Sequence, residues 1–157
     1  MLRNFVLFFA MLFVALTAGR AFWACVGENP ANVSGATYVE FFKSLDRQIA
    51  TPIAITGVGG TLLAGIAALM YRRERALSYL LLAACVGCAV ASMITIIVHL
   101  PINARIATWN PSALPANYRE YLDRWWEWQK LRLVGLFGGM CLIFVAVLLR
   151  KSPAQRS

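Results

Sequence analysis

Charged residues are scarce in this sequence. Only 14% of its 157 residues are Asp, Glu, Lys or Arg, whereas 60% are hydrophobic. A soluble domain carries about 25% charged residues, and a fold of this size has too small a core to hide so much apolar surface. The composition therefore excludes an ordinary soluble protein and favours a membrane protein, in which lipid solvates the outer faces of the helices.

Histidine and cysteine are also scarce. The chain has one histidine, His99, and four cysteines, of which Cys85, Cys88 and Cys141 lie inside apolar runs and only Cys25 lies near an aqueous phase. A disulfide framework needs cysteines in an oxidising aqueous phase, and most metal sites need three or four ligands. The sequence thus excludes a disulfide scaffold and requires no cofactor. A haem held by His99 and a ligand from a partner chain is an alternative without a supporting motif.

Four apolar runs are long enough to cross a bilayer, which needs about 20 residues of helix. Arg3 ahead of the first run resembles a signal peptide, but the run is long and no cleavage site follows, so we expect it to be retained. The sequence predicts an all-α membrane protein, a single four-helix transmembrane domain over residues 1–157 with short amphipathic helices in the two outer connections. The predicted spans are residues 5–23, 53–71, 77–100 and 133–149.

Basic residues gather at the ends of these runs and give the chain a net charge of +8. This distribution fits membrane topology and anionic lipid headgroups, so we expect membrane lipid and not nucleic acid as a partner. The side with both termini and the loop 71–76 carries Arg72, Arg73 and Arg75, with further basic residues at Arg3, Arg150, Lys151 and Arg156, against one acid, Glu74. By the positive-inside rule both termini are predicted to be cytoplasmic.

Small residues recur at four-residue spacing in the spans, which lets helix backbones approach closely in lipid. Gly57, Thr61 and Gly65 form such a ridge in the second span, and Gly135 and Gly139 form one in the fourth. These ridges predict a tightly packed bundle.

The first outer connection, residues 24–52, contains an amphipathic helical pattern. Thr37 and Glu40 match a capping box, and an apolar face follows. We expect this helix to lie at the membrane interface, with a substrate lid as the alternative.

The second outer connection holds most of the polar residues that suggest a site. Pro101 cannot continue a helix without losing a hydrogen bond, so the third span should kink or end near His99. His99 and Asn103 then lie where a polar pocket could open. Farther on, Arg132 is predicted at the start of the fourth span, where an unpaired charge is expensive, so it should face the bundle.

These residues together suggest a pocket for a planar phenolic or quinoid molecule. Aromatic rings would stack on it, arginine would favour its phenolate form, and a histidine could act as general base. The predicted catalytic residues are His99 and Asn103. The predicted binding residues are Trp109, Arg124, Trp125, Trp128 and Arg132.

The same residues carry a resemblance to a known family. His99-x-Pro-Ile-Asn103, a tryptophan six residues on, Arg124-Trp125 and a closing Arg132 resemble the signature of the anthrone-oxygenase family, and the likeness covers almost the whole chain. It implies a four-helix protein of a bacterial inner membrane, since most members are uncharacterised bacterial proteins. It also implies oxidation of an anthrone to an anthraquinone by dioxygen. The motif maps onto His99, Asn103, Trp109, Arg124, Trp125 and Arg132.

Other chemistries find less support in the sequence. Cys85-Val-Gly-Cys88 matches a redox C-x-x-C, but thiol oxidases of that kind need further loop cysteines, and only Cys25 is available. Transport lacks a chain of midplane charges or an inverted repeat. The leading hypothesis is a membrane oxidoreductase acting on a phenolic or quinone-like lipid-soluble molecule. Its rival is a non-catalytic accessory subunit that binds lipid or a partner protein, within a homo-oligomer or a membrane complex.

Overall fold

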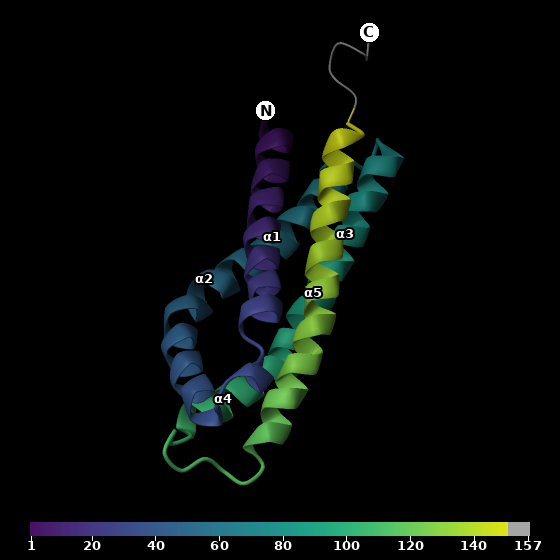
Figure 1. The fold of residues 1–157 in the computed structure, drawn as a ribbon. Helices are drawn as coiled ribbons and strands as arrows, with labels where there is room; N and C mark the ends of the chain where they lie inside the picture. Colours follow the sequence, from purple (N-terminus) through teal and green to yellow (C-terminus); the bar gives the residue numbers. More distant parts are fainter. Residues whose placement is uncertain (151–157) are drawn as a thin grey trace.

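The computed structural model describes residues 1–150, and these residues form a helical bundle (Figure 1). Four helical segments are long and apolar enough to cross a membrane, which confirms the predicted fold class. Lys151 and Arg156, counted in the basic tail, lie outside the described residues. The elements in chain order are α1 (Leu2–Gly27), η1 (Pro30–Asn32), α2 (Gly35–Met70), α3 (Arg75–Ile94), η2 (Thr95–His99), α4 (Leu100–Thr108) and α5 (Tyr118–Leu148).

Helix α2 is longer than the sequence suggested and begins earlier. The hydroxyl oxygen of Ser34 accepts a hydrogen bond from the backbone N–H of Thr37 at 3.2 Å, so Ser34 is the N-cap. The capping box predicted at Thr37 and Glu40 is therefore wrong by one helical turn. The amphipathic segment is helical as expected, but it continues without interruption into the second span and makes a helix of 36 residues.

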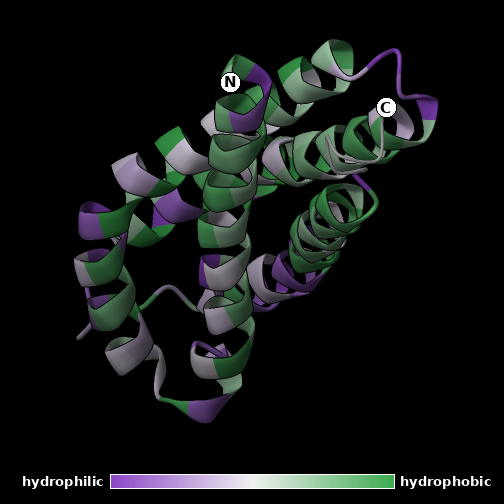
Figure 2. Cartoon of the chain, turned by 90° about the horizontal axis from the view of Figure 1, so that it is seen from above, coloured by the Kyte–Doolittle hydropathy of each residue, from purple (hydrophilic) through white to green (hydrophobic). Residues whose placement is uncertain are grey.

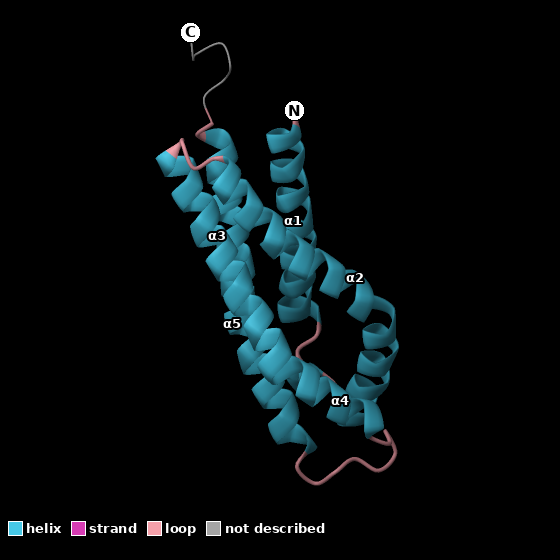
Figure 3. Ribbon diagram, turned by 180° about the vertical axis from the view of Figure 1, so that it is seen from behind, coloured by secondary structure: helices cyan, strands magenta, loops and turns pink. Residues whose placement is uncertain are grey.

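Proline 52 lies inside α2 and explains its shape. Proline has no backbone N–H to bond the carbonyl four residues earlier, and its ring clashes with that carbonyl, so a helix bends there. In Figures 1 and 3 the first half of α2 stands apart from α5, and the second half crosses α1 toward α3. The bend leaves room between the first half of α2 and the rest of the bundle.

The third span changes its geometry just before Pro101. Residues Thr95–His99 form a π-helical turn, and α4 then continues the chain in a helix. This confirms the predicted disruption near His99. A π turn widens the helix by one residue per turn and is frequent at functional sites. It turns His99 inward, where only 1% of its surface is exposed.

Close helix crossings hold the bundle together. A Cβ on Gly87 of α3 would lie 2.9 Å from the carbonyl oxygen of Gly135 on α5, and one on Gly139 would lie 3.1 Å from the carbonyl oxygen of Ala84. On α2 the closest approach to the backbone of another helix is at Gly60, where a Cβ would lie 3.1 Å from the backbone nitrogen of Val14. The ridge of small residues predicted on α2 therefore does not include the position where its backbone comes closest to another helix.

One end of the bundle contains the N-terminus, the turn between α2 and α3, and the end of α5 (Figure 1). There Arg3 forms an ion pair with Glu74 at 2.9 Å and stacks over the ring of Tyr71, whose hydroxyl accepts a hydrogen bond from Arg150. Figure 2 shows that hydrophobic residues cover most of the four long helices. A second apolar cluster, centred on Trp109, Leu122 and Trp125, fills the opposite end.

Candidate functional site

A cavity of about 240 Å³ lies between the bent part of α2 and the other helices. Its wall on one side is an apolar strip of α2 that includes Leu45, Ile49 and Ile53. Several polar residues come from the other elements: Arg20 on α1, His99 on η2, Asn103 on α4 and Arg132 on α5. The volume is near the lower end of the range of about 300–1,000 Å³ for sites that hold small organic ligands.

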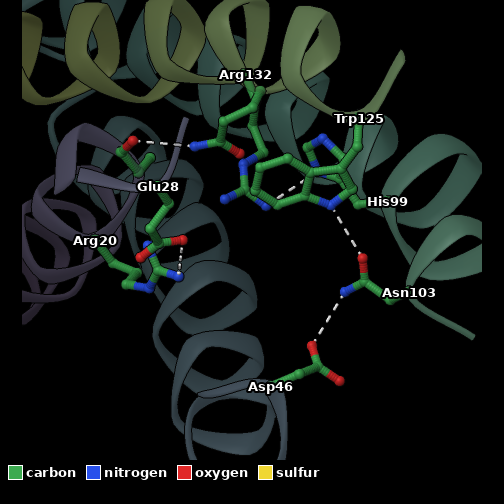
Figure 4. A network of polar contacts seen from close by, with 9 residues as sticks. Arg20, Glu28, Asp46, His99, Asn103, Trp125 and Arg132 are labelled. Carbon is green, nitrogen blue, oxygen red and sulfur yellow. Dashed lines mark hydrogen bonds and ion pairs between the residues drawn. The ribbon is translucent and has the colours of Figure 1, made fainter. Parts of the chain in front are cut away.

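Arg132 lies on the inward face of α5 (Figure 4). Its Nη1 donates hydrogen bonds to Thr95 Oγ1 at 3.3 Å and to Nδ1 of His99 at 3.2 Å. Its Nε is buried without a hydrogen-bond partner among the described residues. Within residues 1–150 no carboxylate forms an ion pair with this guanidinium. A buried cation with only neutral partners is costly, so this end of the cavity favours an anionic or strongly polar ligand group.

The contact with Arg132 determines the protonation pattern of His99. A guanidinium can only donate, so Nδ1 of the imidazole must accept with its lone pair. The proton of the neutral ring therefore sits on Nε2, which is buried and has no hydrogen-bond partner in the described part of the chain. His99 thus offers the cavity a hydrogen-bond donor, not a base. For the same reason Nε2 in this arrangement does not suit an axial ligand of haem, which needs a free lone pair.

Asn103 holds the indole of Trp125 in place. Its side-chain oxygen accepts a hydrogen bond from Trp125 Nε1 at 3.0 Å, and its Nδ2 donates one to Asp46 Oδ1 at 3.1 Å (Figure 4). The Trp125 ring lies beside the His99 ring, with centroids 5.0 Å apart. Each polar group of Asn103 has one neighbour as a partner, so in this geometry Asn103 orients the indole of Trp125.

Four further polar residues, in or beside the cavity, were not singled out from the sequence. Arg20 and Glu28 form a largely buried ion pair at 2.9 Å at the end of α1, and Arg20 also lines the cavity. Gln129 is completely buried and donates a hydrogen bond to the carbonyl of Ala21 at 3.0 Å, which links α5 to α1. Gln129 was detectable, because it follows Trp125 by one turn on the face that leads to Arg132.

Asp46 is the fourth such residue and the one carboxylate that lines the cavity within residues 1–150. It lies on the amphipathic part of α2, where a charged residue is ordinarily solvent-exposed. Only the bend of α2 brings this segment over the cavity, so no local pattern marked it.

The structure brings four of the seven predicted site residues together and places three elsewhere. Those that line the cavity are His99, Asn103, Trp125 and Arg132. Trp109 is buried in the second apolar cluster, where its ring packs edge-on against Tyr121 and its carbonyl accepts a hydrogen bond from Lys43. Arg124 and Trp128 are exposed on α5 and do not line the cavity.

One side of the cavity borders the outer surface of the bundle. Val58, Ile96 and Leu100 line the cavity and are also more than half exposed, at 55%, 57% and 53%. All three lie on helical segments apolar enough to cross a membrane. Lipid is the solvent that such exposed apolar side chains favour, so we expect this side of the bundle to face the bilayer.

The C-x-x-C pair lies apart from this site. The thiol of Cys85 donates to the carbonyl of Thr61 on α2 at 3.4 Å, whereas Cys88 packs at the crossing with Gly139 on α5. Both cysteines are free, and neither lines the cavity. Each thiol fills a helix contact as a small apolar residue would.

The fold and the cavity define a class: a four-helix membrane protein with an interior site that combines hydrogen-bond donors with an aromatic wall. The anthrone oxygenase family model matches residues 40–142, a range that contains all seven predicted site residues. The chain therefore belongs to the anthrone oxygenase family. No curated protein and no solved structure matches the chain.

Proposed function

We propose that this protein is a membrane oxidoreductase that binds a planar phenolic or quinone-like molecule of the anthrone type and oxidises it with dioxygen. The observation that carries the proposal is the buried guanidinium of Arg132, which has no carboxylate partner among the described residues. Arg132 and His99 line the same cavity, and each keeps one hydrogen-bond donor without a partner among the described residues: Nε of Arg132 and Nε2 of His99. Such donors stabilise a phenolate or enolate oxygen more than a neutral carbonyl.

The rest of the cavity suits the rings of such a molecule. Trp125 offers an aromatic face beside His99, and the α2 wall is apolar. Offset or edge contacts between aromatic rings contribute about 0.5–1.5 kcal/mol beyond the burial of their surface. The lipid-facing side of the cavity favours a substrate that partitions into the bilayer.

The proposed reaction balances without a resident cofactor. The methylene carbon opposite the carbonyl of an anthrone loses its two hydrogens and gains an oxygen atom from dioxygen. The second oxygen atom leaves with both hydrogens as water. Dioxygen is thus the electron acceptor, and the role of the protein is to favour the electron-rich anionic form of the substrate.

Turnover of anthrone by protein purified in lipid nanodiscs tests this function. We expect conversion to anthraquinone with one dioxygen consumed per product. Arg132→Gln should weaken anthrone binding at least about tenfold, because hydrogen bonds to charged groups contribute about 1.5–3 kcal/mol each. Arg124→Gln is the matched control, since Arg124 lies on the same helix but is exposed and away from the cavity. Equal effects of the two substitutions would contradict the assignment of Arg132.

The same measurements distinguish the rival function. A non-catalytic subunit would bind a lipid or aromatic molecule in this cavity but consume no dioxygen. Native mass spectrometry of the gently purified protein would then show a retained ligand, and would also report a homo-oligomer or a partner protein.

We further propose that the protein lies in a bacterial inner membrane with both termini in the cytoplasm. The end with the termini carries Arg3, Arg72, Arg73, Arg75 and Arg150 against Glu74. Short cytoplasmic loops are enriched in arginine and lysine, so this end is expected to stay inside. The cavity then lies toward the outer half of the membrane.

A further inference from the structure

The arrangement of donors in the cavity raises the question of which group removes a proton from the substrate. Oxidation of a methylene carbon requires its hydrogens to leave, and the first to leave as a proton forms the anion that Arg132 and His99 would hold. His99 is not suited to accept that proton. Its Nδ1 lone pair already accepts a hydrogen bond from Arg132 at 3.2 Å, and Nε2 carries the ring proton.

We propose that Asp46 is the general base of this site. It is the one carboxylate that lines the cavity within the described residues, and it comes from the opposite wall to Arg132. Figure 4 shows the polar chain that connects the two ends: Trp125 lies beside His99, and Asn103 links Trp125 to Asp46. Asn103 donates to Oδ1 only, so Oδ2 of the carboxylate is free of hydrogen bonds among residues 1–150. This inference rests on the proposed function.

The proton taken by Asp46 has a route to water. Asp46 also lines a second depression, together with the charged residues Lys43 and Arg47. Glu40 and Arg47, its neighbours along α2, are exposed, as expected near an aqueous phase. A carboxylate between an apolar cavity and a polar depression can take a proton on one side and release it on the other.

In the proposed step a C–H bond of the methylene breaks and an O–H bond forms on Asp46. The electron pair of the C–H bond moves into the ring system and onto the oxygen held by Arg132 and His99. Dioxygen, the acceptor named above, then oxidises this anion, and Asp46 returns its proton to water. The donors that stabilise the anion therefore lie at one end of the site, and the base that removes the proton lies at the other.

Deuterium exchange separates this step from the oxidation. Anthrone is incubated with the protein in nanodiscs in D₂O without dioxygen, and incorporation at the methylene carbon above the buffer rate is followed by mass spectrometry. Wild-type protein should accelerate exchange. Asp46→Asn retains an oxygen that can accept from Asn103, so anthrone binding, read from quenching of tryptophan fluorescence, should change less than about threefold. Exchange and the kcat of oxidation should fall by about 100-fold or more, the usual contribution of general base catalysis.

Two further variants make the result decisive. Asp46→Glu keeps the carboxylate on a longer side chain and should restore part of the exchange. If the role of Asp46 were merely structural, the exchange rates of the variants would instead fall in proportion to their loss of thermal stability. Asp123→Asn is the matched control, because Asp123 is exposed on α5, and it should exchange anthrone at the wild-type rate. Wild-type exchange in a folded Asp46→Asn protein overturns the inference while leaving the proposed function intact. A wild-type protein that neither exchanges nor oxidises anthrone overturns both.

Discussion

Replacement of Gly135 by alanine tests whether the crossing of α3 and α5 holds the site together. A Cβ at this position would lie 2.8 Å from the carbonyl oxygen of Gly87 and 3.5 Å from the Cβ of Ala91. Gly138, three residues along the same helix, provides the matched control, because a Cβ there meets nothing within 4 Å.

The expected difference follows from two effects. Alanine in place of glycine stabilises a helix interior by about 0.8–1.0 kcal/mol, and this gain applies equally at both positions. At Gly135 the new methyl group meets a backbone oxygen that no side-chain rotation can move away, and such overpacking costs about 1–3 kcal/mol. Gly138→Ala should thus be as stable as the wild type or more so, and Gly135→Ala should be less stable than Gly138→Ala by about 1–3 kcal/mol.

The assay is reversible unfolding in mixed detergent micelles, with anthrone binding measured on the same samples. Because Gly135 lies one turn from Arg132, separation of α3 from α5 should also lengthen the contact between Arg132 and His99 and weaken binding. Equal stabilities of the two alanine variants would refute the close crossing. A destabilised Gly135→Ala protein with unchanged binding would show that the site does not depend on it.

Three other outcomes are expected. In a cysteine-free background, a cysteine at Asn110 should react with an impermeant maleimide in intact cells and one at Arg73 should not; the reverse pattern would overturn the proposed orientation. Ser34→Ala should destabilise the protein by about 0.5–2 kcal/mol through loss of the N-cap of α2, measured by the same unfolding assay, and no loss would place the helix start elsewhere. Asn103→Leu should destabilise by about 1–3 kcal/mol, because the indole N–H of Trp125 loses its buried acceptor, and should broaden the tryptophan emission; an unchanged spectrum would contradict the orienting role.

The membrane fold and much of the site were predictable because their causes are local. Twenty apolar residues in a row specify a membrane span wherever they occur, and Pro101 disrupts a helix through its own ring. Arg132 was expected to face the bundle because a charge at that depth cannot face lipid. These arguments need only a residue, its neighbours in sequence and the solvent.

The assignment of individual α5 residues was less complete, because several helical faces fit the aromatic pattern. Trp125 and Trp128 were both predicted to bind ligand, but they are three residues apart, and the inward face of α5 continues from Trp125 through Gln129 to Arg132. The helices that pack against α5 decide which of its faces turns inward. Arg124 and Trp128 lie outside that inward face and are exposed.

Local sequence was enough to predict four apolar helices, a break near His99 and an arginine that had to face inward. The tertiary structure alone decided that Nδ1 of His99 accepts from Arg132, which makes the histidine a donor, and that Asp46 lies over the same cavity. Asp46 and Asn103 are 57 residues apart in the chain and meet at 3.1 Å. Their approach depends on how far α2 bends at Pro52 and on which helices stop that bend, and these are properties of the packed bundle, because local sequence permits a bend without fixing its direction.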